Sequence, residues 1–159
     1  MASPKIKLSN LVKSHWNETD TQKASLAVEF VQLLMNDHNF DQVLARFGKN
    51  GYKQHNQTIA DGIEGVITAI KTLTKSAPEF SYDVKHVFVD GDYVILHSHV
   101  TLKAKHRNNP KQGFNIIDSW RIENNDLVEH WDAVQGISFS MRLYALLTGG
   151  KILNRNGIF

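Results

Sequence analysis

The spacing of the apolar residues changes near the middle of the chain, and this change limits the folds open to it. Before Pro78, apolar residues recur at intervals of three and four, as on one face of a helix. After Pro78 they alternate with polar residues, as in a strand with one buried face. Helices followed by consecutive strands are typical of an α+β fold rather than of repeated β-α-β units.

The first half of the chain predicts three helices. The first begins near Thr19 and Asp20, which are good capping residues. The second covers residues 40–47 and precedes a glycine. The third begins at Asp61, and Glu64 follows three residues later in a capping-box pattern.

The second half predicts an antiparallel sheet. We expect strands over residues 80–88, 93–105, 114–123 and 127–135. Asp90-Gly91 is a strong hairpin signal, and asparagine-rich turns separate the later strands. Consecutive strands joined by short turns form an antiparallel meander. An amphipathic helix from Phe139, ending at Gly149–Gly150, then closes one end of the core or contacts a second copy of the chain.

The length of 159 residues suits one domain. We expect its core within residues 20–135 and a carboxy-terminal extension over residues 136–159. No apolar run is long enough for a membrane span, and the N-terminus has no apolar segment of a signal peptide. The sequence has no cysteine, which excludes disulfides, thiolate metal ligands and cysteine catalysis. A cytoplasmic location is therefore the expectation, without membrane contact.

The charge pattern argues against a nucleic-acid partner. The formal net charge is only +2, and phosphate binding needs a clustered basic surface. The densest basic group is Lys103, Lys105, His106 and Arg107, which we interpret as a solvated strand end and turn.

One acidic residue lies on an apolar strand face. The shared face of the strand over residues 114–123 is Phe114, Ile116, Asp118, Trp120 and Ile122. An ionised carboxylate in such surroundings is costly unless it is paired or its pKa rises. We therefore predict a functional role for Asp118, with a buried structural network as the alternative.

Histidines add further candidates. His97 and His99 share one face of the preceding strand, where they serve as acid, base or ligand pair, or only as surface hydrogen-bonding groups. His130 and Asp132 share a face of the last strand, as an oriented imidazole or as a structural pair. His55 lies between the second and third helices, either reaching a cavity or facing solvent.

Several of these segments together carry a family resemblance. They are residues 52–56, 61–62, 84–92, 97–99, 118–124 and 128–132. With them, the chain resembles the SnoaL-like group of the NTF2-like superfamily, whose better-known members are polyketide cyclases that catalyse intramolecular aldol condensation. The resemblance spans about residues 30–135, and the closing residues 154–159 also fit. It departs from the family at Gln57, where a proline is common, and in the longer segment 136–153.

The resemblance implies an NTF2-like cone, in which N-terminal helices pack on a curved antiparallel sheet and enclose a pocket. It also implies a homodimer through the outer face of the sheet. The aspartate that acts as acid and base in the cyclases matches Asp118, and the family histidines match His55, His99 and His130.

From these residues we predict an enzyme of small carbonyl substrates that catalyses aldol condensation, cyclisation or isomerisation without a cofactor. Asp118 takes a proton next to a carbonyl, and His99 or His130 stabilises the oxyanion, with His97 in place of His99 if the inward face is reversed. The residues expected to contact substrate are His97, Phe114, Ile116, Trp120, Asp132 and Tyr52.

Two other functions fit the same residues. A pocket that binds a small hydrophobic carbonyl or acid without catalysis keeps the fold and the aromatic lining. A zinc site made of His97, His99, His130 and a carboxylate is the third possibility, but the resemblance does not require a metal.

Overall fold

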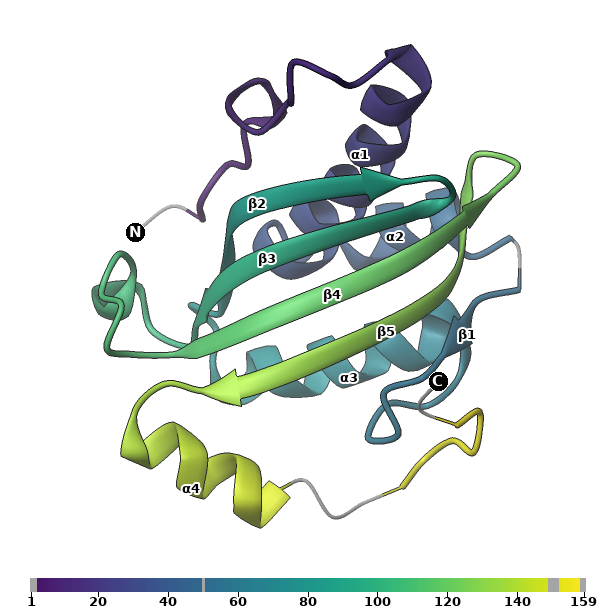
Figure 1. The fold of residues 1–159 in the computed structure, drawn as a ribbon. Helices are drawn as coiled ribbons and strands as arrows, with labels where there is room; N and C mark the ends of the chain where they lie inside the picture. Colours follow the sequence, from purple (N-terminus) through teal and green to yellow (C-terminus); the bar gives the residue numbers. More distant parts are fainter. Residues whose placement is uncertain (1–2, 50, 149–151, 158–159) are drawn as a thin grey trace.

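A layer of helices packs against one face of a curved sheet in the computed structural model, which describes residues 3–49, 51–148 and 152–157. The helices α1, α2 and α3 cover the inner face, and the opposite, outer face of the sheet turns toward the viewer in Figure 1. This arrangement confirms the α+β class predicted from the sequence, with helices packed on a curved sheet.

The three predicted helices are present. They are α1 (Glu18–Val31), α2 (Phe40–Phe47) and α3 (Gly62–Ser76). Helix α1 begins slightly earlier than predicted, because Asn17 is its N-cap and Asp20 completes a capping box with it. A π-helical turn, Gln32–Asn36, continues α1 toward the sheet. Asp61 precedes α3 as predicted, but its side chain does not cap the helix.

The four predicted strands form an antiparallel meander. They are β2 (Ser81–Asp90), β3 (Tyr93–Thr101), β4 (Phe114–Glu123) and β5 (Asp126–Gly136). Strand β3 ends before the predicted Lys105, because the chain turns there into a short 3-10 helix, Ala104–His106.

A fifth strand makes the sheet mixed rather than purely antiparallel. The two-residue strand β1 (Lys53–Gln54) pairs in parallel with β5, so the strand order is β1-β5-β4-β3-β2. The backbone N–H of His55 extends this pairing by donating to His130 O at 3.0 Å. The segment between the second and third helices is therefore bound to the sheet edge, and its side chains have defined directions.

Residues on the two faces of the sheet alternate as predicted in β4, but not throughout β2. The register of β2 shifts between Val84 and His86, so the side chains beyond this bulge change faces. Val87 is consequently buried, while Phe88 is 50% exposed on the outer face. The alternation expected after Pro78 therefore does not hold in this part of β2.

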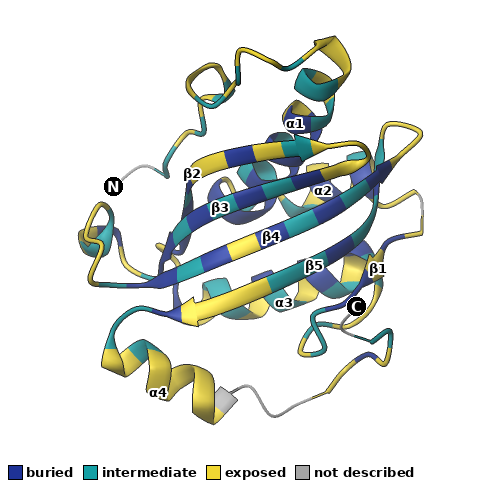
Figure 2. Cartoon of the chain, viewed as in Figure 1, coloured by how far each residue is buried: buried dark blue, intermediate teal, exposed yellow. Residues whose placement is uncertain are grey.

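The predicted helix after the sheet is α4 (Phe139–Thr148), which lies beside the end of β5 (Figure 1). Most of its apolar side chains are exposed, as the yellow colouring in Figure 2 shows. Its predicted end at Gly149–Gly150 and the terminal residues 158–159 lie outside the described residues. No helix in the described part of the chain has the length and apolar character needed to cross a membrane.

Candidate functional site

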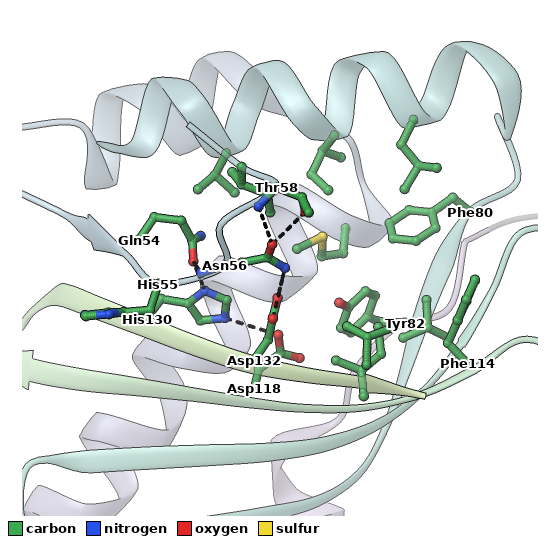
Figure 3. A pocket seen from close by; sticks show the side chains of 18 of the residues that line it. Gln54, His55, Asn56, Thr58, Phe80, Tyr82, Phe114, Asp118, His130 and Asp132 are labelled. Carbon is green, nitrogen blue, oxygen red and sulfur yellow. Dashed lines mark hydrogen bonds and ion pairs between the residues drawn. The ribbon is translucent and has the colours of Figure 1, made fainter. Parts of the chain in front are cut away.

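A cavity of about 510 Å³ opens between the inner face of the sheet and the helices. Its polar side chains gather toward β1 and β5, whereas aromatic and aliphatic side chains line the opposite end (Figure 3). The volume and the few convergent polar groups are typical of small-molecule sites.

Two carboxylates lie side by side on the inner face of the sheet and line the cavity. Asp118 on β4 is paired directly with Asp132 on β5, so both side chains leave the sheet on the same face. Asp118 is only 2% exposed. Its Oδ1 atom lies 3.2 Å from Nε2 of His130, whereas its buried Oδ2 atom has no hydrogen-bond partner among the described residues. Such an unpaired buried oxygen is costly and is available to a ligand.

The second ring nitrogen of His130 fixes its tautomer. Oε1 of Gln54 lies 3.0 Å from Nδ1 of His130 and also accepts the backbone N–H of Asn56 at 2.8 Å. Because the Asn56 N–H can only donate, the oxygen of the Gln54 amide is the atom that faces it, and Nδ1 of His130 carries a proton. His130 Nε2 and Asp118 Oδ1 therefore share a second proton between them.

The apolar surroundings change the acidity of Asp118. Desolvation by burial raises its pKa, and the hydrogen bond from His130 opposes this shift. The nearby carboxylate of Asp132 raises the pKa further. The Trp120 ring lies with its centroid 4.9 Å from that of His130 and adds to the apolar surroundings of the pair. Asp118 is thus a buried carboxyl group that exchanges a proton more readily near neutrality than an exposed one.

Asp132 is held in place by the loop after β1. The amide Nδ2 of Asn56 donates to both Asp132 oxygens, at 2.9 and 2.7 Å. The amide oxygen of Asn56 in turn accepts from the backbone N–H and the hydroxyl of Thr58, at 3.0 and 2.6 Å. Figure 3 shows this chain of contacts reaching from the loop to the sheet.

The carboxy-terminal segment 152–157 anchors the same loop. Asn154 is buried and donates to Asn56 O at 2.9 Å and Ile59 O at 2.7 Å. Asn156 donates to Gln54 O at 2.8 Å and to the carboxylate of Asp61 at 2.9 Å. The Asp61 carboxylate also accepts the Gln54 backbone N–H at 2.8 Å, which explains why it does not cap α3.

Eight predicted site residues line the cavity. They are Asp118, His130, Asp132, Phe114, Ile116, Trp120, Tyr52 and His55. The indole N–H of Trp120 donates to the Tyr52 hydroxyl at 3.1 Å, which satisfies this buried pair. Their assigned roles in catalysis or substrate binding stay predictions, and their common location is what the structure adds.

His97 and His99 are the clearest correction to the sequence analysis. Neither faces the cavity, because His97 pairs with Ile117 across the sheet and His99 with Asn115, both on the outer face. His97 Nε2 lies 2.7 Å from the Asn115 side-chain oxygen. His99 Nε2 lies 2.8 Å from Gln112 O. The residues of β3 that face inward are the small or apolar ones between them.

His55 borders the cavity, but its ring is directed away from Asp118. Its Nε2 lies 2.9 Å from Glu129 Oε1 and its Nδ1 lies 3.0 Å from Gly157 O. The ring stacks on Trp131 with centroids 4.6 Å apart. Because β5 alternates, Glu129 and Trp131 lie on the face opposite His130, and His55 joins them there.

The predicted zinc site cannot form from those residues, since His97 and His99 lie on the opposite face of the sheet from His130. A different set of possible ligand atoms occurs at Asp118, His130 and Asp132, where they lie within 4.8 Å of one another. These oxygen and nitrogen atoms are suitable ligands for a divalent cation, but Asp118 Oδ1 and His130 Nε2 already share a proton.

The sequence analysis assigned no role to Gln54 and Asn56, which complete the polar end of the cavity. The inward direction of these two side chains follows from their positions on either side of His55 in an extended segment. Successive side chains in such a segment alternate in direction, so an outward His55 implies that both of its neighbours point inward. Gln54 lines the cavity, and its buried Nε2 has no partner among the described residues.

The comparisons with known proteins identify the family. The model of the SnoaL-like polyketide cyclase family matches residues 25–140. The chain therefore belongs to the SnoaL-like polyketide cyclase family, as the sequence resemblance predicted. No curated protein matches the chain.

Solved structures show the same fold at low sequence identity. A candidate polyketide cyclase from Bacillus cereus is 18% identical, with a TM-score of 0.65 over 96% of this chain and 95% of that one. A candidate SnoaL-like polyketide cyclase from a Jannaschia species is 16% identical, with a TM-score of 0.63 over 90% and 99%. A candidate hydroxylase from Streptomyces galilaeus is 17% identical, with a TM-score of 0.57 over 82% and 86%. The fold is thus shared by proteins described with different activities.

Proposed function

We propose that the chain is an enzyme of small carbonyl compounds that catalyses an aldol-type cyclisation or an isomerisation without a cofactor. The observation that carries this proposal is the pair Asp118 and His130, buried together under an apolar cavity with one carboxylate oxygen unpaired. A base of this kind suits removal of a weakly acidic proton next to a carbonyl.

The first step uses the free oxygen of Asp118. With the shared proton on His130, the Asp118 carboxylate takes a proton from the carbon next to a carbonyl through Oδ2. The C–H bond breaks, an O–H bond forms on Asp118, and the electron pair moves into an enolate. The Asp118–His130 pair gains one positive charge as the substrate gains a negative one, which limits the cost of charge separation in the cavity.

The second step returns the proton. The enolate carbon bonds to another carbonyl carbon of the same molecule, and the alkoxide that forms takes the proton from Asp118. Every atom of the substrate is kept, so the product is an isomer, and no oxidant or reductant is consumed.

A donor for the enolate oxygen is also at hand. Gln54 holds His130 through its oxygen and presents a buried amide N–H group without a partner in the described part of the chain. One such donor contributes about 3 kcal/mol to stabilising a developing oxyanion. We propose Gln54 as a donor in the role that the sequence analysis gave to His99 or His130.

The test is deuterium exchange of the acidic protons of a β-diketone, followed by NMR in heavy water. We expect Asp118→Asn to slow the enzyme-dependent exchange by about tenfold or more, because an amide cannot accept the proton. Asp83→Asn is the matched control, since Asp83 lies opposite His99 on the outer face and should leave the rate unchanged.

Equal exchange rates for wild type and Asp118→Asn would remove the catalytic role. The alternative, a pocket that binds a hydrophobic carbonyl compound without turnover, would then be the better interpretation of the same cavity.

A further inference from the structure

The polar end of the cavity has an unbalanced charge. Asp118 and His130 share one proton, so together they carry no net charge in either position of that proton. Among the described residues Asp132 has no such partner, because the contacts of its two oxygens are with the neutral Asn56 amide. Among the described residues that line the cavity, none is a lysine or arginine.

Two cationic side chains near this end of the sheet lie on its other side. Arg121 and Lys53 both contact Glu129 on the outer face, at 2.9 and 3.6 Å. Alternation along β5 directs Glu129 away from Asp132, and the sheet separates this network from the cavity. Asp132 therefore faces the ligand space without a lysine or arginine among the described residues that line the cavity, and the neighbouring Asp118–His130 pair carries no net charge.

We infer that Asp132 is a specificity-determining residue that excludes carboxylate and phosphate ligands and reserves the cavity for uncharged carbonyl compounds. A bound anion would lie near this carboxylate in a poorly hydrated space, where repulsion between like charges is only weakly screened. An uncharged ketone avoids this repulsion and still fills the apolar end.

This inference rests on the proposed function for the location of the ligand, but it does not depend on turnover. The apolar end of the cavity includes Phe80, Phe114 and Leu102, which suit an aromatic body. An aryl ketone and the carboxylate of the same ring system therefore differ, for this cavity, mainly in charge.

Acetonaphthone and naphthoate are the matched probes, and isothermal titration calorimetry at neutral pH measures their dissociation constants. We expect wild type to bind the ketone about tenfold more tightly than the carboxylate or better. Asp132→Asn removes the charge and keeps one of the two oxygens that accept from Asn56. It should tighten naphthoate binding by about tenfold and change ketone binding by less than about threefold.

Asp41→Asn is the control for a general change in protein charge, since Asp41 is exposed on α2. It should leave both constants unchanged. Equal binding of the two probes to wild type, failure of the ketone to bind, or an unchanged ratio in Asp132→Asn would each overturn the inference. Tighter binding of naphthylmethylamine than of the ketone would also overturn it, because the carboxylate would then select cations.

These outcomes are distinct from those of the exchange experiment. A chain that binds acetonaphthone selectively but exchanges β-diketone protons no faster than Asp118→Asn would keep this inference and lose the catalytic proposal.

Discussion

The two faces of the sheet carry similar side chains in different environments. On the inner face, His130 is bonded to Asp118 and Gln54 inside an apolar cavity, and one oxygen of Asp118 stays unpaired. On the outer face, His97 and His99 are half-buried and bond to amide or carbonyl oxygens near solvent. Histidines on both faces are hydrogen-bonded, so hydrogen bonding alone does not distinguish them.

The difference lies in what each arrangement leaves unpaired. An inward pair that shares a proton and exposes a free oxygen to a cavity can act on a ligand. An outward histidine bonded to a backbone carbonyl, like His99, mainly stabilises the turn that contains Gln112. A site on this fold is therefore better recognised by burial and unpaired atoms than by residue type.

The largest effect should come from replacing a histidine by glutamine on one face of the sheet or the other. We expect His130→Gln to lower the rate of β-diketone proton exchange by about 100-fold, because the shared proton and its positive charge are lost. His99→Gln should stay within about twofold of wild type, since its partner lies outside the cavity. Deuterium exchange by NMR measures both, and a comparable loss in the two variants would contradict the distinction between the faces.

The sequence predicted the inner face of β4 correctly because this strand has ten residues with strict alternation of burial. The alternation alone thus suffices to place Asp118 among apolar neighbours. The same rule failed in β2, since a bulge near Lys85 reverses the faces and leaves no mark in the apolar pattern.

Alternation also could not say which face of β3 is buried. It grouped His97 with His99 correctly, but only the register across the sheet shows that Leu96, not His97, lies opposite Asp118. The loop from Gln54 to Asn56 was harder still. Its strand has only two residues, and its position depends on contacts with the distant carboxy-terminal segment, which no local pattern records.

The second largest effect tests whether the carboxy-terminal segment 152–157 anchors the loop at the polar end of the cavity. Asn154→Ala removes the buried donor to two part-buried carbonyl groups, and we expect a loss of about 2 kcal/mol in unfolding free energy. Asn10→Ala, at an exposed position, should change stability by less than about 0.5 kcal/mol. Urea unfolding measures both. Equal stability of the two variants would show that segment 152–157 does not anchor the loop.

A smaller effect is expected on the free energy of unfolding when the buried carboxylate of Asp118 is replaced by an amide. Burial raises the pKa of Asp118 in the folded state. Its protonated form therefore stabilises the fold fully at pH values below the unfolded pKa, and this stabilisation is lost as pH rises through the folded pKa. Asp118→Asn should therefore be as stable as wild type at pH 7 or more stable by about 1 kcal/mol. The difference should shrink toward about pH 4, near the ordinary aspartate pKa.

Denaturant unfolding across this pH range measures the effect. A loss of more than about 2 kcal/mol at neutral pH would instead make Asp118 a buried partner in a structural network. That outcome would weaken the catalytic proposal even if the exchange rate also fell.

The smallest effect on the cavity should come from changes on the outer face, which we propose as the contact between two copies of the chain. Phe88, Tyr93 and Ile117 are 50%, 42% and 37% exposed there, without a covering helix among the described residues.

Ile117→Glu should weaken the dimer and leave proton exchange within about twofold of wild type, because the substituted side chain points away from the cavity. Val12→Glu, at a similarly exposed position before α1, should leave the dimer intact. Sedimentation velocity at micromolar concentration measures both, and a wild-type monomer would contradict the proposed contact. A dimer that Ile117→Glu does not weaken would place the contact elsewhere, for which the exposed apolar side chains of α4 are the next candidate.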